Sequence, residues 1–421
     1  MTWISELETI APSSRSEVAA YAVDGRIPRL VCFPADIDEL SRCLAAADRQ
    51  GLAVIPAGCG SHLGVGRPPA RYDLAISTRR MNRVLAHEAA DLTVTVEAGI
   101  TIAELEDRLA IAGQSLPLDP PRAEAATVGA VIATDAWGPL RHSQGRVRDL
   151  VIGLRAVLAD GTIVRSGGQV VKNVAGYDLM KAFCGSHGAL GIIAEASFKL
   201  RPLAEQSAMI RVAASNLSAA IEIALAVREL PVEPAALAAL DPAAAALLSE
   251  NGAVVLLALA GTATEIAAQV DELRRVHPSL RLTDAEPCRA LLGQLAGFPC
   301  AGEGDWMLRL SALPSTLAAL LEIVQDEARR IDVPSSIVCY PGSGVGWIRL
   351  AGGLRVQAAA GFVDRARASV CARGGHLVVT TLSPEAKEHI DPWGRLPAPG
   401  LQQRLRAAFD PAARLSRGRF G

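Results

Sequence analysis

A glycine-rich loop at residues 56–66, Pro-Ala-Gly-Cys-Gly-Ser-His-Leu-Gly-Val-Gly, constrains most strongly what this chain can fold into. The apolar run at residues 52–55 predicts a buried strand before it, and residues 37–49 carry the apolar spacing of a helix. Glycines let consecutive backbone N–H groups point into one concavity and approach an anion closely. The loop is therefore a candidate phosphate-binding turn, although glycine-rich loops are also common in ordinary turns.

Two well-known phosphate loops do not fit this stretch. A P-loop nucleotidase needs a lysine in the Walker position, and none follows here. The dinucleotide fingerprint G-x-G-x-x-G needs a helix directly after the loop. Here Arg67, Pro68 and Pro69 follow, and the two prolines oppose such a helix start. The loop therefore belongs to another class of phosphate-binding turn.

The composition excludes several classes of protein. A chain of 421 residues predicts two or three domains. A net charge of −2 with scattered basic residues argues against a nucleic-acid partner. The apolar run at residues 253–260 is too short to span a bilayer, and the N-terminus lacks the regions of a secretory signal, so we expect no transmembrane segment. Eight cysteines without a C-x-x-C pair argue against a disulfide scaffold, a zinc site or an iron–sulfur cluster in this chain, and fit a reducing cytoplasm.

Two more segments of small residues follow the first loop. Residues 127–134, Thr-Val-Gly-Ala-Val-Ile-Ala-Thr, would let backbone lie against a flat ring or a phosphate, but they would also suit a tightly packed helix start, which the residues alone favour. Residues 185–191, Gly-Ser-His-Gly-Ala-Leu-Gly, form a third glycine loop before a predicted strand at residues 192–200. Residues 84–96 and 151–165 carry the signals of two hairpins.

The second half of the chain has a different pattern. From about residue 204, strand-like runs alternate with long alanine-rich helices, which predicts an α+β domain with helices on one face of a mostly antiparallel sheet. We therefore expect one domain over residues 1–203, a second over residues 204–395, and a C-terminal helix and tail over residues 396–421 that return to the first domain.

Five motifs together identify a family. They are P-A-G-C-G-S-H-L-G from Pro56, A-T-V-G-A-V-I-A-T from Ala126, G-G-Q-V-V-K-N-V-A-G-Y-D-L from Gly167, G-S-H-G-A-L-G-I-I from Gly185 and F-D-P from Phe409. With them the chain resembles the FAD-binding oxidoreductases of the PCMH type (the vanillyl-alcohol-oxidase class), strongly over residues 27–203 and more weakly beyond. The string K-N-V-A-G-Y-D-L is similar to the branch of the E subunit of bacterial glycolate oxidase. This resemblance implies an α+β fold: a PCMH-type FAD-binding domain of two α+β subdomains, followed by an α+β ferredoxin-like cap domain with an antiparallel sheet.

The resemblance also implies where FAD would bind. The loop at residues 56–63 would wrap the pyrophosphate with backbone donors, residues 117–118 and 127–134 would line the flavin and its ribityl chain, and residues 192–193 would offer backbone contacts. Four residues between 143 and 149 are weaker candidates. The cofactor-binding candidates are Pro56, Ala57, Gly58, Cys59, Gly60, Ser61, His62, Leu63, Pro117, Leu118, Thr127, Val128, Gly129, Ala133, Thr134, Ser143, Gly145, Arg148, Asp149, Ile192 and Ile193. For Lys172, Tyr177 and Asp178 we expect a structural role.

Two departures from the family pattern bear on chemistry. Relatives with covalent flavin carry a histidine directly after the second glycine of the loop, where this chain has Ser61, so the resemblance implies non-covalent FAD with His62 near the phosphates. Relatives that oxidise 2-hydroxy acids carry a G-H-x-G-D-G-N-x-H segment, whose histidines bind a divalent metal. Residues 340–349 keep its glycines but neither the histidines nor the acid, so we expect no metal site and name no catalytic residue. Arg349 could bind a carboxylate, but a solvated or paired charge is the favoured interpretation.

These inferences favour an FAD-binding subunit of a glycolate-oxidase-like 2-hydroxy acid dehydrogenase complex. A second flavoprotein subunit would hold the metal and oxidise a small 2-hydroxy acid, and an iron–sulfur subunit would take the electrons onward. The expected location is the cytoplasm, with peripheral attachment to the inner membrane through partners as a further option. Two alternatives stay open: a self-sufficient FAD-dependent oxidase or dehydrogenase with a different substrate, and a non-catalytic assembly subunit, which the bulk of Cys59 and His62 in the loop would suit.

Overall fold

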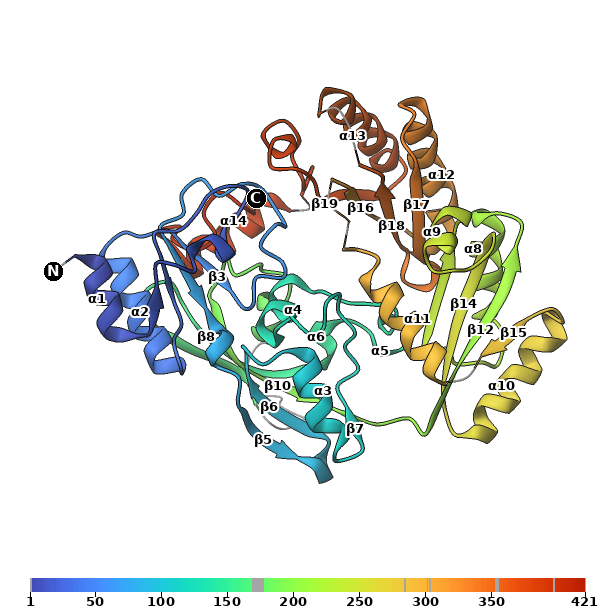
Figure 1. Cartoon of the computed structure of the whole chain (residues 1–421), viewed down its shortest axis with the longest axis horizontal. Coiled ribbons are helices and arrows are strands. Elements are labelled where there is room, and N and C mark those ends of the chain that lie inside the picture. Colours follow the sequence, from blue (N-terminus) through green and yellow to red (C-terminus); the bar gives the residue numbers. More distant parts are fainter. Residues whose placement is uncertain are drawn as a thin grey trace. The chain divides into compact units, whose positions relative to one another are not determined.

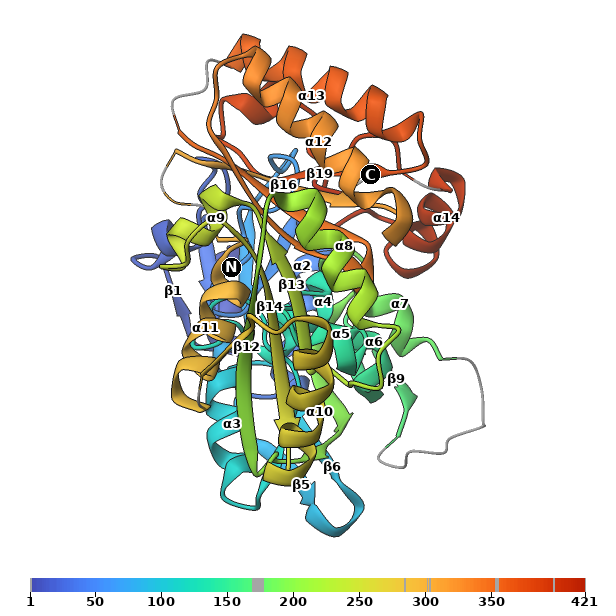
Figure 2. The same ribbon diagram turned by 90° about the vertical axis from the view of Figure 1, so that its right-hand side faces the viewer.

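The chain divides into two compact units, each of which mixes helices and strands (Figure 1, Figure 2). The computed structural model describes residues 2–168, 178–283, 285–300, 302, 304–352, 356–396 and 398–420. The first unit comprises Met1–Trp137, Arg146–Leu203 and Arg395–Gly421, and the second comprises Gly138–Gly145 and Ala204–Gly394. The α+β class predicted from the sequence is confirmed. Lys172 and Tyr177 lie outside the described residues.

In its described residues, the first unit holds a four-stranded sheet, a five-stranded sheet and a two-stranded pair, together with the helices that cover them. Its helices are α1 (Trp3–Ile10), α2 (Ile37–Arg49), α3 (Ile102–Ala110), α4 (Val128–Thr134), α6 (Val147–Leu150), α7 (Met180–Phe183) and α14 (Pro399–Phe409), with 3-10 turns η1 (Val18–Tyr21), η2 (Thr78–Arg80) and η3 (Ala89–Asp91). Its strands are β1 (Ser13–Ser14), β2 (Leu30–Cys32), β3 (Val54–Ala57), β4 (Leu74–Ser77), β5 (Val84–Glu88), β6 (Thr93–Glu97), β7 (Gln114–Ser115), β8 (Val151–Val157), β9 (Ile163–Gly167), β10 (Ile192–Lys199) and β11 (Arg201–Pro202).

The smaller sheet, in the order β1-β2-β4-β3, carries the first glycine loop at the end of β3. Strands β2 and β3 both pair with β4 in parallel, and such buried parallel strands read as continuous apolar runs, as residues 52–55 do. Helix α2 begins where the Asp36 side chain accepts the Glu39 N–H at 2.8 Å, and its residues Leu40 and Leu44 are fully buried. The strand and helix before the loop are as predicted, so the loop leaves the carboxyl end of a buried parallel strand.

The larger sheet of the first unit, β5-β6-β10-β8-β9, is antiparallel throughout. Both hairpins predicted from the sequence are present, as β5–β6 and β8–β9. Helices α3 and α4 share an apolar core with strands β6, β8 and β10. Helix α3 begins with a capping box between Thr101 and Glu104.

The C-terminal tail returns to the first unit after α14. The Val54 N–H donates to the Arg414 carbonyl at 2.9 Å, and the Ser416 N–H donates to the Val54 carbonyl at 2.9 Å. These two bonds add Leu415, which is fully buried, as a parallel bridge beside β3. The tail therefore lies next to the strand from which the first glycine loop leaves.

The second unit is built on one eight-stranded antiparallel sheet in the order β15-β12-β14-β13-β17-β18-β16-β19. Its strands are β12 (Gln206–Ala214), β13 (Ala236–Leu240), β14 (Ala253–Gly261), β15 (Arg281–Thr283), β16 (Trp306–Ser311), β17 (Ser335–Tyr340), β18 (Val345–Leu350) and β19 (His376–Thr381). Its helices are α5 (Arg141–Gln144), α8 (Leu217–Val227), α9 (Pro242–Leu247), α10 (Ala263–Val276), α11 (Ala285–Gly297), α12 (Pro314–Arg330) and α13 (Val356–Cys371), with 3-10 turns η4 (Pro341–Ser343) and η5 (Ala386–Glu388).

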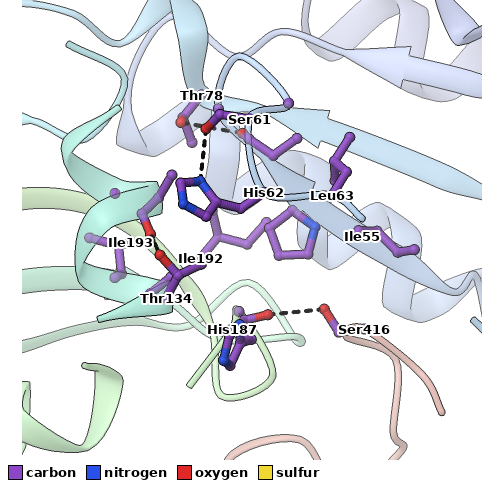
Figure 3. Close-up of a pocket in the computed structure, with 18 of the residues that line it drawn as sticks. Ile55, Ser61, His62, Leu63, Thr78, Thr134, His187, Ile192, Ile193 and Ser416 are labelled. Atoms are coloured by element: carbon purple, nitrogen blue, oxygen red, sulfur yellow. Dashed lines mark hydrogen bonds between the residues drawn. The ribbon is translucent and has the colours of Figure 1, made fainter. Parts of the chain in front are cut away.

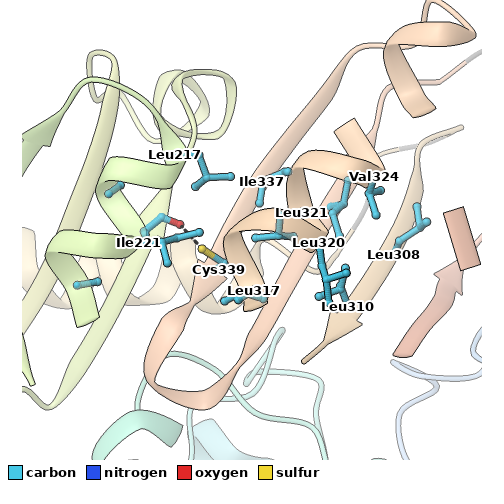
Figure 4. Close-up of a cluster of buried hydrophobic side chains, with 14 of the residues drawn as sticks. Leu217, Ile221, Leu308, Leu310, Leu317, Leu320, Leu321, Val324, Ile337 and Cys339 are labelled. Atoms are coloured by element: carbon cyan, nitrogen blue, oxygen red, sulfur yellow. Dashed lines mark hydrogen bonds between the residues drawn. The ribbon is translucent and has the colours of Figure 1, made fainter. Parts of the chain in front are cut away.

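This sheet consists of two similar halves. Apart from the short helix α9, β12-α8-β13-β14-α10-β15 and β16-α12-β17-β18-α13-β19 both follow the β-α-β-β-α-β order of a ferredoxin-like motif. The halves join through the pairing of β13 with β17. Helices α8 and α12 bury residues such as Leu217, Leu320 and Leu321 in one core with the sheet (Figure 4). Helices α8, α10, α12 and α13 share a core with one face of the antiparallel sheet, as predicted, whereas α11 lies against the other face, where Tyr340 Oη donates to the Leu295 carbonyl at 3.4 Å. Among the described residues, no helix has the length and apolar character needed to cross a membrane.

Candidate functional site

A cavity in the first unit collects the segments that the sequence singled out (Figure 3). Its empty space is about 700 Å³, counting the part that is open to solvent. Its walls come from the end of β3 and the first glycine loop, the start of η2, helix α4, the third glycine loop with the start of β10, and the C-terminal tail. The predicted residues that line it are Pro56, Ala57, Gly58, Gly60, Ser61, His62, Leu63, Gly129, Ala133, Thr134, Ile192 and Ile193.

A buried hydroxyl chain fixes the first glycine loop. Tyr21 Oη donates to Ser77 Oγ at 3.0 Å, and Ser77 Oγ donates to the Gly58 carbonyl at 2.8 Å. Ser77 itself is fully buried. Gly60 adopts a φ of +86°, which a residue with a side chain rarely adopts. The loop therefore has a set conformation rather than that of a loose surface turn.

Helix α4 ties the first and third glycine loops together. At its start, a Cβ on Gly58 would lie only 2.2 Å from Thr127 Oγ1. At its end, the Ile132 carbonyl accepts the Gly185 N–H at 3.0 Å, and the Ala133 carbonyl accepts the His187 N–H at 2.7 Å. The small residues of this segment thus serve close packing in a helix, the interpretation that the residues alone favoured.

His62 brings an aromatic ring to the cavity wall. Its Nδ1 lies 2.9 Å from Ser61 Oγ (Figure 3). Burial, with a smaller contribution from the positive charge of Arg122, lowers the pKa of the His62 imidazole to about 4. At neutral pH the ring is therefore uncharged, and it can offer a hydrogen bond and an apolar face but no positive charge.

The C-terminal tail supplies a wall that the sequence analysis did not assign to the site. Ser416, Arg419 and Phe420 line the cavity. Ser416 Oγ donates to the His187 carbonyl at 3.3 Å, and the Phe420 ring stacks on the His187 ring with 4.5 Å between centroids. The F-D-P motif drew attention to this region, but no local pattern marks these residues, because their partners lie hundreds of positions away in the sequence. Ala130, which lies within the predicted stretch 127–134, also lines the cavity, as do Ile55, Thr78, His187, Gly188 and Gly191, which were not assigned to the cofactor.

The other predicted residues lie elsewhere in the structure. They are Cys59, Pro117, Leu118, Thr127, Val128, Ser143, Gly145, Arg148 and Asp149. Cys59 is exposed at the loop surface, whereas Thr127 and Val128 are fully buried. Their contact with a cofactor stays a prediction, as it does for the residues around the cavity.

Of the weaker candidates, Ser143 and Gly145 belong to the second unit, in which Ser143 Oγ donates to the Ala235 carbonyl at 2.9 Å. Arg148 and Asp149 lie on the short helix α6 of the first unit. They form an exposed ion pair, with 3.6 Å between Arg148 Nε and Asp149 Oδ1. None of the four is buried in a way that would mark it for a site.

In the second unit, Arg349 is a paired charge. Its Nε donates to Asp305 Oδ2 at 2.6 Å, so the favoured interpretation of this arginine is confirmed. Within the described part of the chain, no group of three or more His, Cys, Asp or Glu side chains is placed to hold a metal ion.

The residues around the cavity fit FAD. The walls combine glycine and alanine backbone with the apolar side chains of Ile55, Leu63 and Ile192, which suits close approach to a flat ring system. Ser61 and Arg419 place polar donors at the same cavity, which suits a pyrophosphate. A large cofactor with an apolar ring and a charged middle needs both kinds of wall.

Comparison with protein families and with known proteins supports this fit. Residues 28–167 match the family model described as FAD binding domain. The chain is 34% identical over 215 residues to glycolate oxidase subunit GlcD of Bacillus subtilis, covering 51% of this chain and 46% of that protein. It is 36% identical over 181 residues to glycolate oxidase subunit GlcE of Escherichia coli, covering 43% of this chain and 51% of that protein. It is 35% identical over 215 residues to D-lactate dehydrogenase of Archaeoglobus fulgidus, covering 48% of this chain and 47% of that protein. The matches thus span about half the length of these relatives.

Solved structures share the fold. The chain superposes on alkyldihydroxyacetonephosphate synthase with a TM-score of 0.75 and 17% identity, covering 99% of this chain and 86% of that one. It superposes on p-cresol methylhydroxylase with substrate bound with a TM-score of 0.77 and 14% identity, covering 99% and 96%. At this identity the likeness establishes the architecture and not the reaction.

Proposed function

We propose that this chain is an FAD-binding oxidoreductase of the PCMH type and, more specifically, the FAD-carrying subunit of a glycolate-oxidase-like 2-hydroxy acid dehydrogenase, because residues 28–167 match the FAD binding domain family. The similarity to two subunits of glycolate oxidase, GlcD and GlcE, carries this proposal. FAD, when bound, can accept two electrons from one donor and release them to another. The K-N-V-A-G-Y-D-L string favours the role of the E subunit within such a complex.

The proposal assigns the cavity of the first unit to the cofactor. The first glycine loop, from Pro56 to Leu63, would hold the pyrophosphate, and helix α4 with residues Ile192 and Ile193 would face the ring end. Ser61 stands where a covalent attachment would need histidine, which supports non-covalent binding. The protein's own contribution is to position the cofactor and to shield it from water.

The proposal assigns hydroxy-acid oxidation to a partner. Residues 340–349 span the end of β17, the turn η4 and most of β18, and they contain no histidine or acidic side chain, so this segment offers no ligand of the kind a divalent metal needs. A second flavoprotein subunit would supply that site, and an iron–sulfur subunit would receive the electrons. We place this complex in the cytoplasm, with any attachment to the inner membrane made through the partners.

Anaerobic flavin spectroscopy tests whether oxidation of the hydroxy acid requires the partner subunits. The isolated FAD-loaded chain is mixed with glycolate or D-lactate, and the flavin absorbance is recorded with and without the co-expressed partner subunits. We expect no bleaching by the isolated chain, bleaching in the assembled complex, and co-purification of the three polypeptides. Full bleaching and turnover by the isolated chain, with no polypeptide associated, would refute the subunit assignment.

A second candidate function is a self-sufficient 2-hydroxy acid dehydrogenase. The observation that favours it is the 35% identity to the D-lactate dehydrogenase of Archaeoglobus fulgidus over 215 residues. The same spectroscopic experiment separates the two candidates, because this one predicts that substrate bleaches the flavin of the isolated chain.

A further inference from the structure

The C-terminal segment 414–420 runs beside the first glycine loop and the residues that follow it. The Arg67 N–H donates to the Arg419 carbonyl at 3.2 Å, and the Ala70 N–H donates to the Arg417 carbonyl at 2.9 Å. The tail packs tightly against the loop at Gly66, where an added Cβ would lie 2.8 Å from the Phe420 ring. The position of the loop is therefore set in part by residues from the other end of the chain.

Arg419 is the buried arginine of this contact. Its side chain is 2% exposed, and its guanidinium donates through Nη2 to the carbonyls of both Leu63 and Val65. The same residue lines the cavity. Burial lowers the pKa of the guanidinium to about 10, with the charges of Asp24 and Tyr72 acting in the opposite direction, so the group stays protonated at neutral pH.

A buried cation is costly unless it is compensated. Removing a charged group from water carries a large free-energy penalty, which the hydrogen bonds to the two carbonyls and the negative charge of Asp24 offset. An anion bound in the cavity that Arg419 lines would interact favourably with the same guanidinium. The two carbonyls that accept from Arg419 belong to the loop itself, so the same side chain can hold the loop in shape and interact with an anion bound in the cavity.

We propose that Ser416, Arg419 and Phe420 are part of the FAD site and that Arg419 is a positioning residue for the loop. The guanidinium Nη2 holds the loop at Leu63 and Val65 in the shape that receives the cofactor, and the guanidinium places a positive charge beside the pyrophosphate. This inference rests on the assignment of the cavity to FAD under the proposed function. It adds that cofactor retention depends on the last residues of the chain, which in the sequence lie far beyond the segment that matches the family model.

Binding of FAD to the apoprotein tests this proposal. The full chain is prepared as wild type, Arg419→Met and Arg419→Lys, with Arg417→Met as the matched control, because Arg417 is exposed and its substitution removes the same charge two residues away. Loss of a charged hydrogen-bond donor predicts a Kd for FAD about 10- to 100-fold weaker in Arg419→Met. Arg419→Lys keeps the charge but not the planar guanidinium that places Nη2 between the two carbonyls, so its Kd should fall between those of wild type and Arg419→Met. Arg417→Met should stay within about twofold of wild type, since an exposed charge is screened by salt.

Hydrogen exchange in the wild-type chain provides a test that needs no variant. FAD should slow the exchange of the amides in residues 63–70 and in residues 414–420 together. Protection of the loop with unchanged exchange in the tail, or an Arg419→Met variant that binds FAD as tightly as wild type, would overturn the role of the tail while leaving FAD binding intact. Failure of the wild-type chain to bind FAD at all would instead refute the assignment of the cavity.

Discussion

The substitution Gly58→Ala tests whether the first glycine loop must pack on helix α4. The added Cβ would lie 2.2 Å from Thr127 Oγ1 and 2.7 Å from Thr127 Cγ2, where ordinary contacts are 3.4–4 Å. The backbone of Gly58 does not adopt a positive φ, so the strain comes from this contact alone. Overpacking of this kind costs about 1–3 kcal/mol, and the loop must move away from the helix to relieve it. We therefore expect a destabilised protein with weaker FAD binding.

Two variants make this expectation specific. Gly64→Ala is the matched control in the same loop, because a Cβ there meets no atom within 4 Å, and its stability should change by less than about 1 kcal/mol. Thr127→Ala removes the two atoms that clash, at a cost of about 1 kcal/mol for the lost helix cap. The double variant Gly58→Ala/Thr127→Ala should therefore be less destabilised than the sum of the single changes.

The assay is urea unfolding of the apoprotein, followed by tryptophan fluorescence, together with the Kd for FAD of each variant. Gly58→Ala should lower the urea midpoint and raise the Kd, while Gly64→Ala should do neither. If Gly58→Ala matches wild type in both measurements, or if the Thr127→Ala background does not reduce its effect, the close packing of loop and helix is not what shapes the site.

Two partly buried titratable groups give opposite pH dependences. The pKa of His62 falls from 6.5 to about 4 on folding, so the stability from its neutral form is fully present above pH 6.5 and is lost as the pH falls toward 4. This loss of unfolding free energy is about 3 kcal/mol at most. In urea unfolding, the stability of His62→Gln should therefore decline less steeply over this pH window than that of wild type. Burial raises the pKa of Glu106 from 4.5 to about 7, although its carboxylate accepts the Leu116 N–H at 2.7 Å. Stability from this group is therefore greatest below pH 4.5 and is lost as the pH rises through 7. The variant Glu106→Gln should be more stable than wild type above pH 7 and equally stable at low pH. A variant that is less stable than wild type at both low and high pH would contradict this reasoning.

Local signals in the sequence predicted the elements that surround the site. Helix α2 has the predicted bounds, since its cap at Asp36 and its apolar spacing are both short-range features. The first glycine loop follows a buried strand, as the apolar run before it indicated. The family motifs then supplied the fold class and the cofactor, which composition and spacing alone left open.

The features that the sequence analysis missed depend on long-range contacts. Arg419 meets the carbonyls of Leu63 and Val65 from more than 350 positions away, and no periodicity in the sequence records such a pairing. Segment 138–145 belongs to the second unit although it lies within the predicted first domain, because Ser143 bonds to the backbone beside β13. Thr127 has the small polar side chain expected of a cofactor contact, yet it is buried as a helix cap against Gly58.

The flavin content of the purified full chain tests the central claim most directly. The protein is purified without added cofactor, denatured by heat, and centrifuged, and the flavin in the supernatant and the pellet is quantified. A cavity that holds FAD without a covalent bond predicts FAD in the supernatant in a ratio approaching one per chain. A colourless protein that also fails to take up added FAD, or flavin that stays attached to the precipitated chain, would contradict it.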